Sequence, residues 1–310
     1  MTVAPNLDGG VVALSTSPPA DLGRLGFPEA EFGRVVFNLC MRIVRTRGRI
    51  LYGGHLQEGS LTASMFEFVA SAYVPNTLSN RGEIPRPFLH LLPLSEFKRT
   101  PFARVRDVQQ RFGSFLETRV ILNAREYASV SSRSGELLIR FGGAGGNEVK
   151  IAGPDEFTRF SSGLPLHDQQ SALTAMRDAA QKLTGARVVL GGKRGDLGVP
   201  GDADRFFGVM PGIYEEALSS LRTKIPTVIF AAYGGAARDL AIDLGLLDRN
   251  LETPFLGEIQ SGYFEARERM RLLRREIPEL DRRALSEFAV REDCENLARD
   301  AIAWVDSHAN

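Results

Sequence analysis

The chain has 310 residues, of which 43% are hydrophobic and 25% charged, as in ordinary globular proteins. Lysine and arginine together number 38, and so do aspartate and glutamate, so the zero net charge disfavours nucleic acid and membrane surfaces as partners. No apolar run approaches the roughly 20 residues of a membrane span. The N-terminus, MTVAPNLDGG, lacks the cationic and apolar regions of a signal peptide. These features predict a cytoplasmic protein.

The first hundred residues alternate short apolar segments with amphipathic ones. Strands are predicted at 11–17, 49–55 and 88–94, and helices at 29–48 and 61–74, from the spacing of the apolar residues. This alternation is typical of right-handed βαβ units. The sequence therefore predicts a Rossmann-like α/β fold with an open, mainly parallel sheet and helices on both faces.

The pattern changes over residues 98–165, where charge is scattered. Residues 136–153 have the pattern of a β-hairpin, with GGAGG at 142–146 as its tip. Because no helix follows this glycine cluster, we interpret it as a flexible turn and not as a phosphate-binding loop. We interpret the whole segment as a β-rich insertion that decorates the sheet.

The strand–helix alternation then returns. Helices are predicted at 168–185, 212–223 and 236–247, and strands at 186–195 and 225–235.

From Phe264 onward the chain is rich in arginine and glutamate, with apolar residues at helical spacing. We expect two or three helices there, packed on the sheet edge with their charges in solvent. The predicted organisation is a Rossmann-like domain at 1–260 and a C-terminal helical extension at 261–310.

Metal sites and disulfides have little support in the sequence. Cys40 and Cys294 are far apart and lie in amphipathic segments, which predicts buried thiols in a reducing compartment. The four histidines do not cluster, and the sequence contains neither CxxC nor HExxH. We therefore expect no metal and no bound cofactor.

Three predicted strands end in the same dipeptide: Gly53–Gly54, Gly191–Gly192 and Gly234–Gly235. Open parallel sheets bind ligands outside the carboxyl ends of their strands, where the strand order reverses. Glycines there allow backbone N–H groups to approach phosphate oxygens. The sequence lacks both the GxxxxGK[ST] loop and a GxGxxG motif before a helix. These features predict a nucleotide-type ligand without P-loop ATP hydrolysis or conventional NAD-dependent hydride transfer.

A further part of the predicted site is Pro211 and Gly212, which precede Tyr214, Glu215 and Glu216 at the head of a helix. Carboxylates in a first turn are stabilised by the helix dipole alone, so they do not require a ligand. Adjacent helical residues point about 100° apart, and we expect Glu215 to face the ligand. Tyr214 can stack on a base, or pack against a neighbouring helix.

Other side chains at the strand ends suit parts of a nucleotide. Ser15 and Ser17 can hydrogen-bond a phosphate or ribose, or belong to a plain turn. His55 can contact a phosphate or base, or lie on the surface. Lys193 and Arg194 can neutralise a diphosphate, or remain a solvated pair.

Four segments resemble the SLOG superfamily, a Rossmann-like group that includes the LOG phosphoribohydrolases and the Smf/DprA proteins: LSTSPP, YGGHLQEGSLTASM, LGGKRGDLGVPG and MPGIYEEAL. In LOG enzymes a glycine-rich loop follows the second strand, and a PGGxGTxEE motif opens a later helix. The residues that match these two motifs are Gly53, Gly54, Pro211, Gly212, Glu215 and Glu216. The resemblance covers about 11–95 and 168–247.

The second motif departs from the LOG pattern, because PGIYEE lacks one glycine and the threonine. The chain looks more like the SLOG branches found with TIR and Sir2 domains in bacterial anti-phage systems such as Thoeris. Those branches bind nucleotide-derived signals, including relatives of cyclic ADP-ribose. The resemblance implies a homo-oligomeric sensor of a nucleotide or ADP-ribose-type ligand, with any effector being a separate protein.

Two alternatives remain. The LOG enzymes imply an N-glycoside hydrolase acting on a nucleoside monophosphate or NAD, with Glu215 and Glu216 as catalytic carboxylates. The DprA proteins imply nucleic-acid binding, which the zero net charge disfavours.

Overall fold

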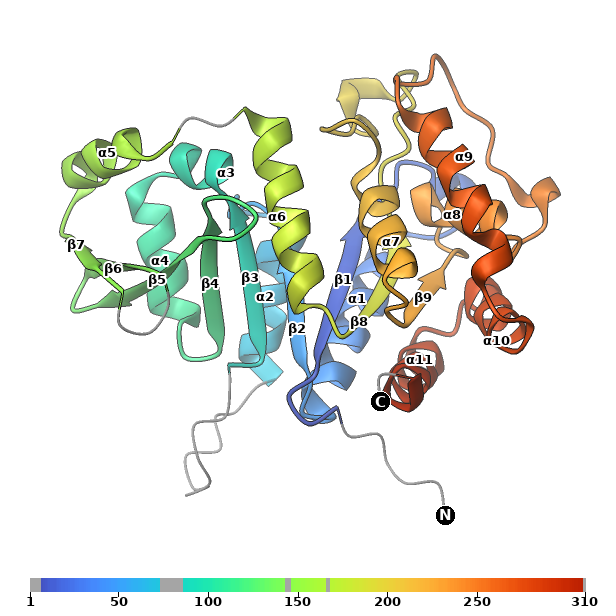
Figure 1. Cartoon of the computed structure of the whole chain (residues 1–310), viewed down its shortest axis with the longest axis horizontal. Helices are drawn as coiled ribbons and strands as arrows, with labels where there is room; N and C mark the ends of the chain where they lie inside the picture. Colours follow the sequence, from blue (N-terminus) through green and yellow to red (C-terminus); the bar gives the residue numbers. More distant parts are fainter. Residues whose placement is uncertain (1–6, 73–85, 143–145, 166–167, 309–310) are drawn as a thin grey trace.

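The structure is a computed structural model that describes residues 7–72, 86–142, 146–165 and 168–308. Within these residues the chain forms one sheet from nine strands, which are β1 (Val11–Ser17), β2 (Arg49–Gly53), β3 (Phe88–Pro93), β4 (Leu116–Ile121), β5 (Tyr127–Arg133), β6 (Glu136–Phe141), β7 (Glu148–Ile151), β8 (Ala186–Gly191) and β9 (Thr227–Phe230). Their spatial order is β7-β6-β5-β4-β3-β2-β1-β8-β9, so the strand order reverses at β1 (Figure 1). The predicted α/β class is confirmed.

The sheet is parallel from β4 through β1 to β9, and antiparallel from β4 to β7. The predicted hairpin at 136–153 is the β6–β7 pair, although residues 143–145 of its tip lie outside the described residues. The segment predicted to decorate the sheet instead continues it, because β4 pairs with β3 and β5 to β7 follow in turn.

The helices are α1 (Glu29–Arg45), α2 (Leu61–Ala72), α3 (Leu94–Arg99), α4 (Phe102–Phe112), α5 (Pro154–Gly163), α6 (Gln169–Leu183), α7 (Gly212–Arg222), α8 (Gly235–Leu244), α9 (Tyr263–Leu273), α10 (Glu279–Val290) and α11 (Cys294–His308). Figure 1 shows α6 and α7 in front of the sheet and α1 and α2 behind it. Helices therefore cover both faces, which explains why β3 and β8 are buried along their whole length.

The C-terminal segment is helical, as predicted. Helix α10 packs on the edge strand β9, α11 packs on α1, and α9 packs on α7 and α8. Helix α1 shows why these segments are helical: its apolar residues face the core, and its first and last turns carry acidic and basic residues that match the helix dipole.

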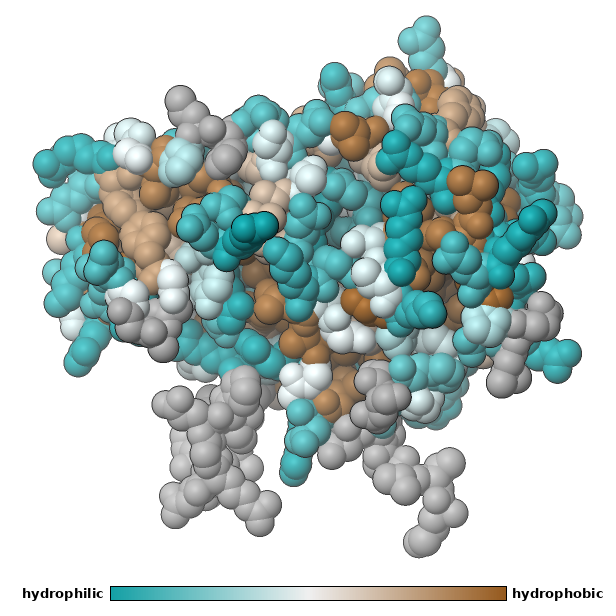
Figure 2. Space-filling view, in the orientation of Figure 1, coloured by the Kyte–Doolittle hydropathy of each residue, from teal (hydrophilic) through white to brown (hydrophobic). Residues whose placement is uncertain are grey.

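Both cysteines are buried, as predicted. No helix among the described residues is both long and apolar enough to span a membrane. Figure 2 shows a mostly hydrophilic face with separate small hydrophobic patches, one of them over α9. On α9, Leu272 is 76% and Phe264 60% exposed.

Candidate functional site

A cleft of about 1040 Å³ lies at the carboxyl ends of β1, β2 and β3, beside the reversal of strand order. Open α/β sheets bind ligands at this position. Its other walls include the first turns of α2 and α7, one side of α6, and residues of α3 and α4. The predicted site residues that line the cleft are Ser15, Ser17, Gly53, Gly54, His55, Lys193, Gly212 and Glu216.

The lining of the cleft favours an anion. The N–H groups in the first turn of a helix lack intrahelical partners and carry the positive end of the dipole, and both α2 and α7 begin at the cleft. The lining also holds more cations than carboxylates: Arg99, Arg104, Arg177, Lys193 and Arg205 against Glu58, Glu96 and Glu216. A phosphate-bearing ligand suits both features.

Glu216 is fixed in the cleft wall by two donors from different strands. Its Oε2 accepts a hydrogen bond from Ser15 Oγ and another, of 2.9 Å, from Arg187 Nη1. Arg187 Nη1 also lies 2.5 Å from Ser15 Oγ. The Arg187 side chain is 2% exposed, and its burial lowers the pKa of the guanidinium, which the charge of Glu216 raises. This buried cation is the ion-pair partner of Glu216.

The two adjacent glutamates face differently, and the expectation for Glu215 is corrected. Glu216 lines the cleft, whereas Glu215 forms a 2.5 Å ion pair with Arg177 Nη1. The burial of Tyr214 and Ala217 fixes the rotation of α7, and this rotation turns Glu216 toward β1. Arg177 packs closely over Gly212, because a Cβ on Gly212 would lie 2.4 Å from Arg177 Nη2 and the side chain would have to shift.

Two buried polar atoms at the cleft have no hydrogen-bond partner among the described residues. They are Thr16 Oγ1 and Arg177 Nε, and both residues line the cleft. Arg177 Nε lies 3.7 Å from Glu216 Oε1, beyond hydrogen-bond distance. Since buried polar groups are normally satisfied, these two atoms are candidates to contact a ligand.

Gly53 and Gly54 form the diglycine corner that borders the cleft. Gly54 N donates to Leu91 O at 3.2 Å, and Gly54 O lies 2.9 Å from His90 Nε2, which donates to it. Burial lowers the pKa of His90 to about 4, so this imidazole is neutral at pH 7. The corner thus lines the cleft while its own polar groups bond to β3.

The other two corners are buried, which corrects the prediction that all three expose bare amides. Gly192 N donates to Ser17 O and Gly235 N to Asp21 Oδ1, each at 2.8 Å. A Cβ on Gly235 would lie 2.4 Å from Gly192 O, so these corners pack against one another. Gly191 and Gly234 are also buried and absent from the cleft lining. The cleft lining instead includes the first residues of α2 and α7, and N–H groups in the first turn of a helix lack intrahelical partners.

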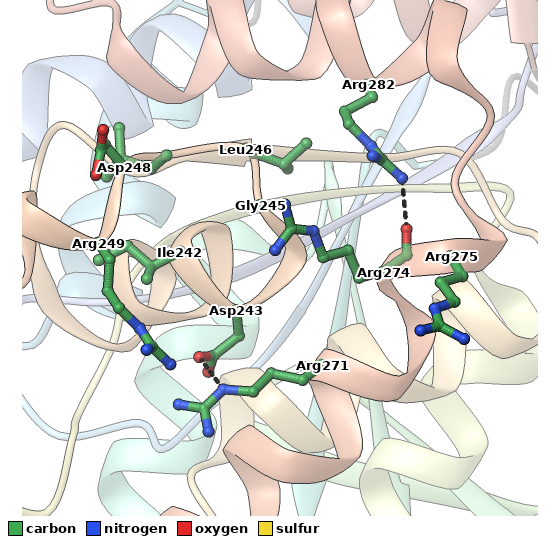
Figure 3. A pocket seen from close by; sticks show the side chains of 11 residues that line it. Ile242, Asp243, Gly245, Leu246, Asp248, Arg249, Arg271, Arg274, Arg275 and Arg282 are labelled. Carbon is green, nitrogen blue, oxygen red and sulfur yellow. Dashed lines mark hydrogen bonds and ion pairs between the residues drawn. The ribbon is translucent and has the colours of Figure 1, made fainter.

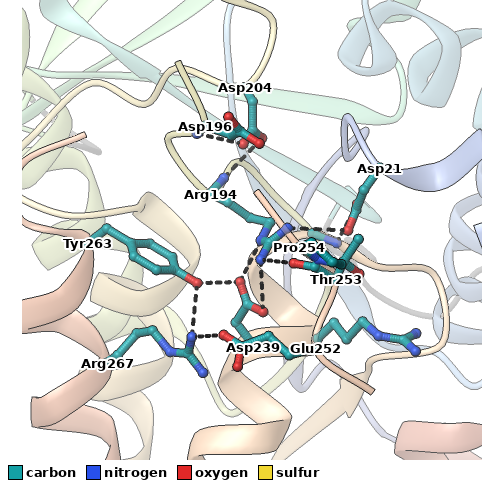
Figure 4. A network of polar contacts seen from close by, with 12 residues as sticks. Asp21, Arg194, Asp196, Asp204, Asp239, Glu252, Thr253, Pro254, Tyr263 and Arg267 are labelled. Carbon is teal, nitrogen blue, oxygen red and sulfur yellow. Dashed lines mark hydrogen bonds and ion pairs between the residues drawn. The ribbon is translucent and has the colours of Figure 1, made fainter. Parts of the chain in front are cut away.

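Arg194 was predicted to counter a ligand charge but lies in a buried network (Figure 4). Its Nε donates to Asp239 Oδ2 at 2.6 Å, and its Nη2 donates to Thr253 O at 2.7 Å. The guanidinium also lies 3.9 Å from the centre of the Phe255 ring. Burial raises the pKa of Asp239 to about 6, although Arg194 and Tyr263 lower it. Only Lys193 of the predicted cationic pair lines the cleft.

Tyr214 and Pro211 are also buried outside the cleft lining. Tyr214 O–H donates to Asp243 Oδ2 at 2.8 Å, so stacking of this ring on a ligand base is excluded by its packing. Pro211 serves as the N-cap residue of α7.

Among the residues that were not predicted, Thr16, Arg104 and Arg177 line the cleft, and the buried Arg187 lies outside the lining and holds Glu216. Arg104 Nε donates to Leu56 O at 2.6 Å and so holds the loop after β2. Arg187 left a signal in the sequence, because a charged residue within a buried strand such as ARVVLGG requires a specific partner. Arg177 lies on an amphipathic helix and resembles any solvated arginine in the sequence.

The fold and the cleft define a Rossmann-like α/β protein with a cationic cleft at its strand ends. Among the described residues, no cluster of three histidine, cysteine, aspartate or glutamate side chains is placed to hold a metal. The chain belongs to the SLOG cluster2 family, whose model matches residues 6–126 and 148–302. No curated protein matches the chain.

Proposed function

We propose that the cleft binds a nucleotide or ADP-ribose-type ligand and that the protein acts by sensing this ligand. The observation that carries the proposal is Glu216, held by Ser15 and Arg187 through Oε2 so that Oε1 is available in a cationic cleft. Membership of a SLOG family is consistent with a nucleotide-related function.

Each part of such a ligand has a partner in the cleft. The phosphates would accept N–H bonds from the first turns of α2 and α7, and Lys193 would counter their charge. A ribose hydroxyl would donate to Glu216 Oε1. Phe207, which lines the cleft and is 52% exposed, would stack on the base in the role that had been predicted for Tyr214.

N-glycoside hydrolysis is the second candidate, because a fixed carboxylate in the cleft also suits this reaction. The bond between ribose C1′ and the base nitrogen would break, and the base would leave with the electron pair. Glu216 would stabilise the oxocarbenium-like sugar. Water would then add to C1′ and lose a proton, while the departing base gains one.

Calorimetry and product analysis separate the two candidates. The full chain would be titrated with AMP, NAD and ADP-ribose, and each mixture would be chromatographed after prolonged incubation. We expect saturable binding of at least one ligand without release of base. Glu216→Gln should weaken binding roughly tenfold, and Glu215→Gln should have a smaller effect.

Release of base by the wild type, abolished in Glu216→Gln, would replace sensing with hydrolysis. No binding of any of the three ligands would contradict both candidates.

We further propose that the sensor is a homo-oligomer whose assembly changes on ligand binding, with a separate effector protein as its partner. The exposed Phe264 and Leu272 on α9 support an apolar contact involving the C-terminal helices. Light scattering with and without ligand would test this, and a monomer under both conditions would contradict it.

A further inference from the structure

A second cavity, of about 920 Å³, lies away from the cleft at the carboxyl end of α8. Its walls come from the end of α9, the start of α10, the short helix η3 (Arg249–Leu251) and the short helix η4 (Arg274–Glu276). The arginines that line it are Arg249, Arg271, Arg274, Arg275 and Arg282 (Figure 3). None of these residues belongs to the cleft described above.

The carboxylates in this arginine cavity do not balance its cations. Two line it, Asp243 and Asp248. Asp243 accepts from Arg267 Nε at 2.8 Å and from Arg271 Nε at 3.0 Å, so its charge is already shared. Asp248 Oδ1 accepts from Asn250 N at 3.2 Å.

Three arginines of the cavity, Arg249, Arg274 and Arg275, form no ion pair with any described residue. Figure 3 shows Arg249 beside Asp243 and Arg274 over Gly245, with Arg275 farther out at the rim of the cavity. Gly245 makes this approach possible, because a Cβ on it would lie 2.4 Å from Arg274 Nε.

A purely structural role explains only part of this arrangement. Cations stabilise the carboxyl end of a helix, and α8 ends here at Leu244. That helix end is equivalent to about half a negative charge, which is too little for three unpaired guanidiniums. Like charges around one cavity repel, so an anionic ligand would stabilise the folded state.

We infer that the arginine cavity binds a small molecule carrying two or more linked phosphates. Guanidinium groups recognise phosphate through paired N–H donors, and several of them converging suit an oligophosphate better than a single phosphate. The cavity volume is that of a small-molecule site. Ile242, Leu246 and Leu247 add an apolar wall that could accept a nucleoside. This inference does not depend on the function proposed for the cleft.

The test is calorimetric titration of the full chain with tripolyphosphate, ATP and inorganic phosphate. We expect one tripolyphosphate site per chain in this cavity, with affinity at least about tenfold above that for phosphate. Arg249→Ala and Arg275→Ala should each weaken binding roughly tenfold or more, and Arg275→Lys should restore only part of it. Both arginines are exposed, so these variants should fold, which circular dichroism would confirm.

Arg283→Ala is the matched control, because Arg283 is an exposed arginine of α10 outside the cavity lining. Lys193→Ala controls for binding in the cleft. Neither control should change the affinity of the arginine-cavity site by more than about twofold, whereas Lys193→Ala should weaken any phosphate binding in the cleft. If ATP binds more tightly than tripolyphosphate, the ligand is assigned as a nucleoside polyphosphate. If the two bind equally, the site recognises the phosphate chain alone.

Absence of tripolyphosphate and ATP binding would overturn the inference. An equal loss of affinity in Arg283→Ala would also overturn it, because it would show that binding is a diffuse electrostatic attraction. Loss of all binding in Lys193→Ala would overturn it too, because it would place the ligand in the cleft.

Discussion

Two diglycine corners of the same sheet edge have opposite environments. Gly53 and Gly54 follow β2 and are partly exposed in the wall of the cleft. Gly234 and Gly235 follow β9 and are buried against Asp21 and Gly192. The same dipeptide after a parallel strand therefore serves a ligand cleft in one place and close packing in the other. The two corners differ in which strand ends lie beside them in the sheet, and this arrangement cannot be predicted from the local sequence.

The largest expected contrast between these corners is in stability. Gly235→Ala should destabilise the fold by about 4 kcal/mol, because φ is +65° and the new Cβ would meet backbone atoms. Gly53→Ala should cost about 1 kcal/mol or less, since its Cβ meets only the flexible end of Met176. Urea denaturation of the two variants measures the difference. Similar losses in both would show that the corners are packed alike.

A smaller effect on stability is expected when the two glutamates at the start of α7 are replaced one at a time. Glu216→Gln should destabilise the protein by about 3 kcal/mol, because it removes the carboxylate partner of the buried Arg187. Glu215→Gln should cost about 1 kcal/mol, since Arg177 also lies near Glu216. Thermal denaturation of both variants provides the comparison, and an effect in the reverse order would refute the assigned roles.

The stability of the fold around Gly53 and Gly54 should also depend on pH, because Gly54 O accepts a hydrogen bond from His90. Its pKa falls from 6.5 to about 4 on burial. The unfolded chain therefore binds a proton more readily than the folded one, and stability is lost as pH falls from about 6.5 to about 4. The loss is about 2 to 3 kcal/mol. In His90→Gln this part of the pH dependence should disappear from urea midpoints measured across the range. An unchanged profile would locate the acid sensitivity elsewhere.

The smallest effect concerns the adjacent cations after β8. Lys193→Met should weaken binding of a phosphate-bearing ligand by about 1 kcal/mol and leave stability unchanged, because Lys193 lines the cleft. Arg194→Met should instead destabilise the fold, because it leaves Asp239 buried without its ion-pair partner. Parallel calorimetry and denaturation test this assignment. A loss of affinity confined to Arg194→Met would reverse it.

Much of the fold was predictable because apolar residues recur at fixed intervals along buried strands and helices. The strand at 11–17 matches β1, and the helix at 212–223 matches α7 within one residue. The role of residues 98–165 was not predictable, because strand pairing between distant segments depends on which sheet edge is free. The sequence pattern predicted the hairpin of β6 and β7, did not identify β4 or β5 individually, and did not say which strand the segment joins.

The site was predictable only in part. Sequence placed Ser15, Gly53 and Lys193 at strand ends, and all three line the cleft. The choice between Glu215 and Glu216 depended on the rotation of α7, which tertiary packing fixes. Arg177 on α6 lines the cleft and Arg187 on β8 pairs with Glu216, and no motif joins these arginines to the glutamates. The arginine cavity was hidden in a segment whose charges looked like solvated helix faces.

Hydrogen–deuterium exchange on the full chain tests the central claim most directly, with ADP-ribose at saturation and with no ligand. The structure predicts slower amide exchange at 53–62 and 212–216, around the cleft, and no change at 234–238, around the buried corner. Protection centred on 234–238, or no protection at the starts of α2 and α7, would contradict the account.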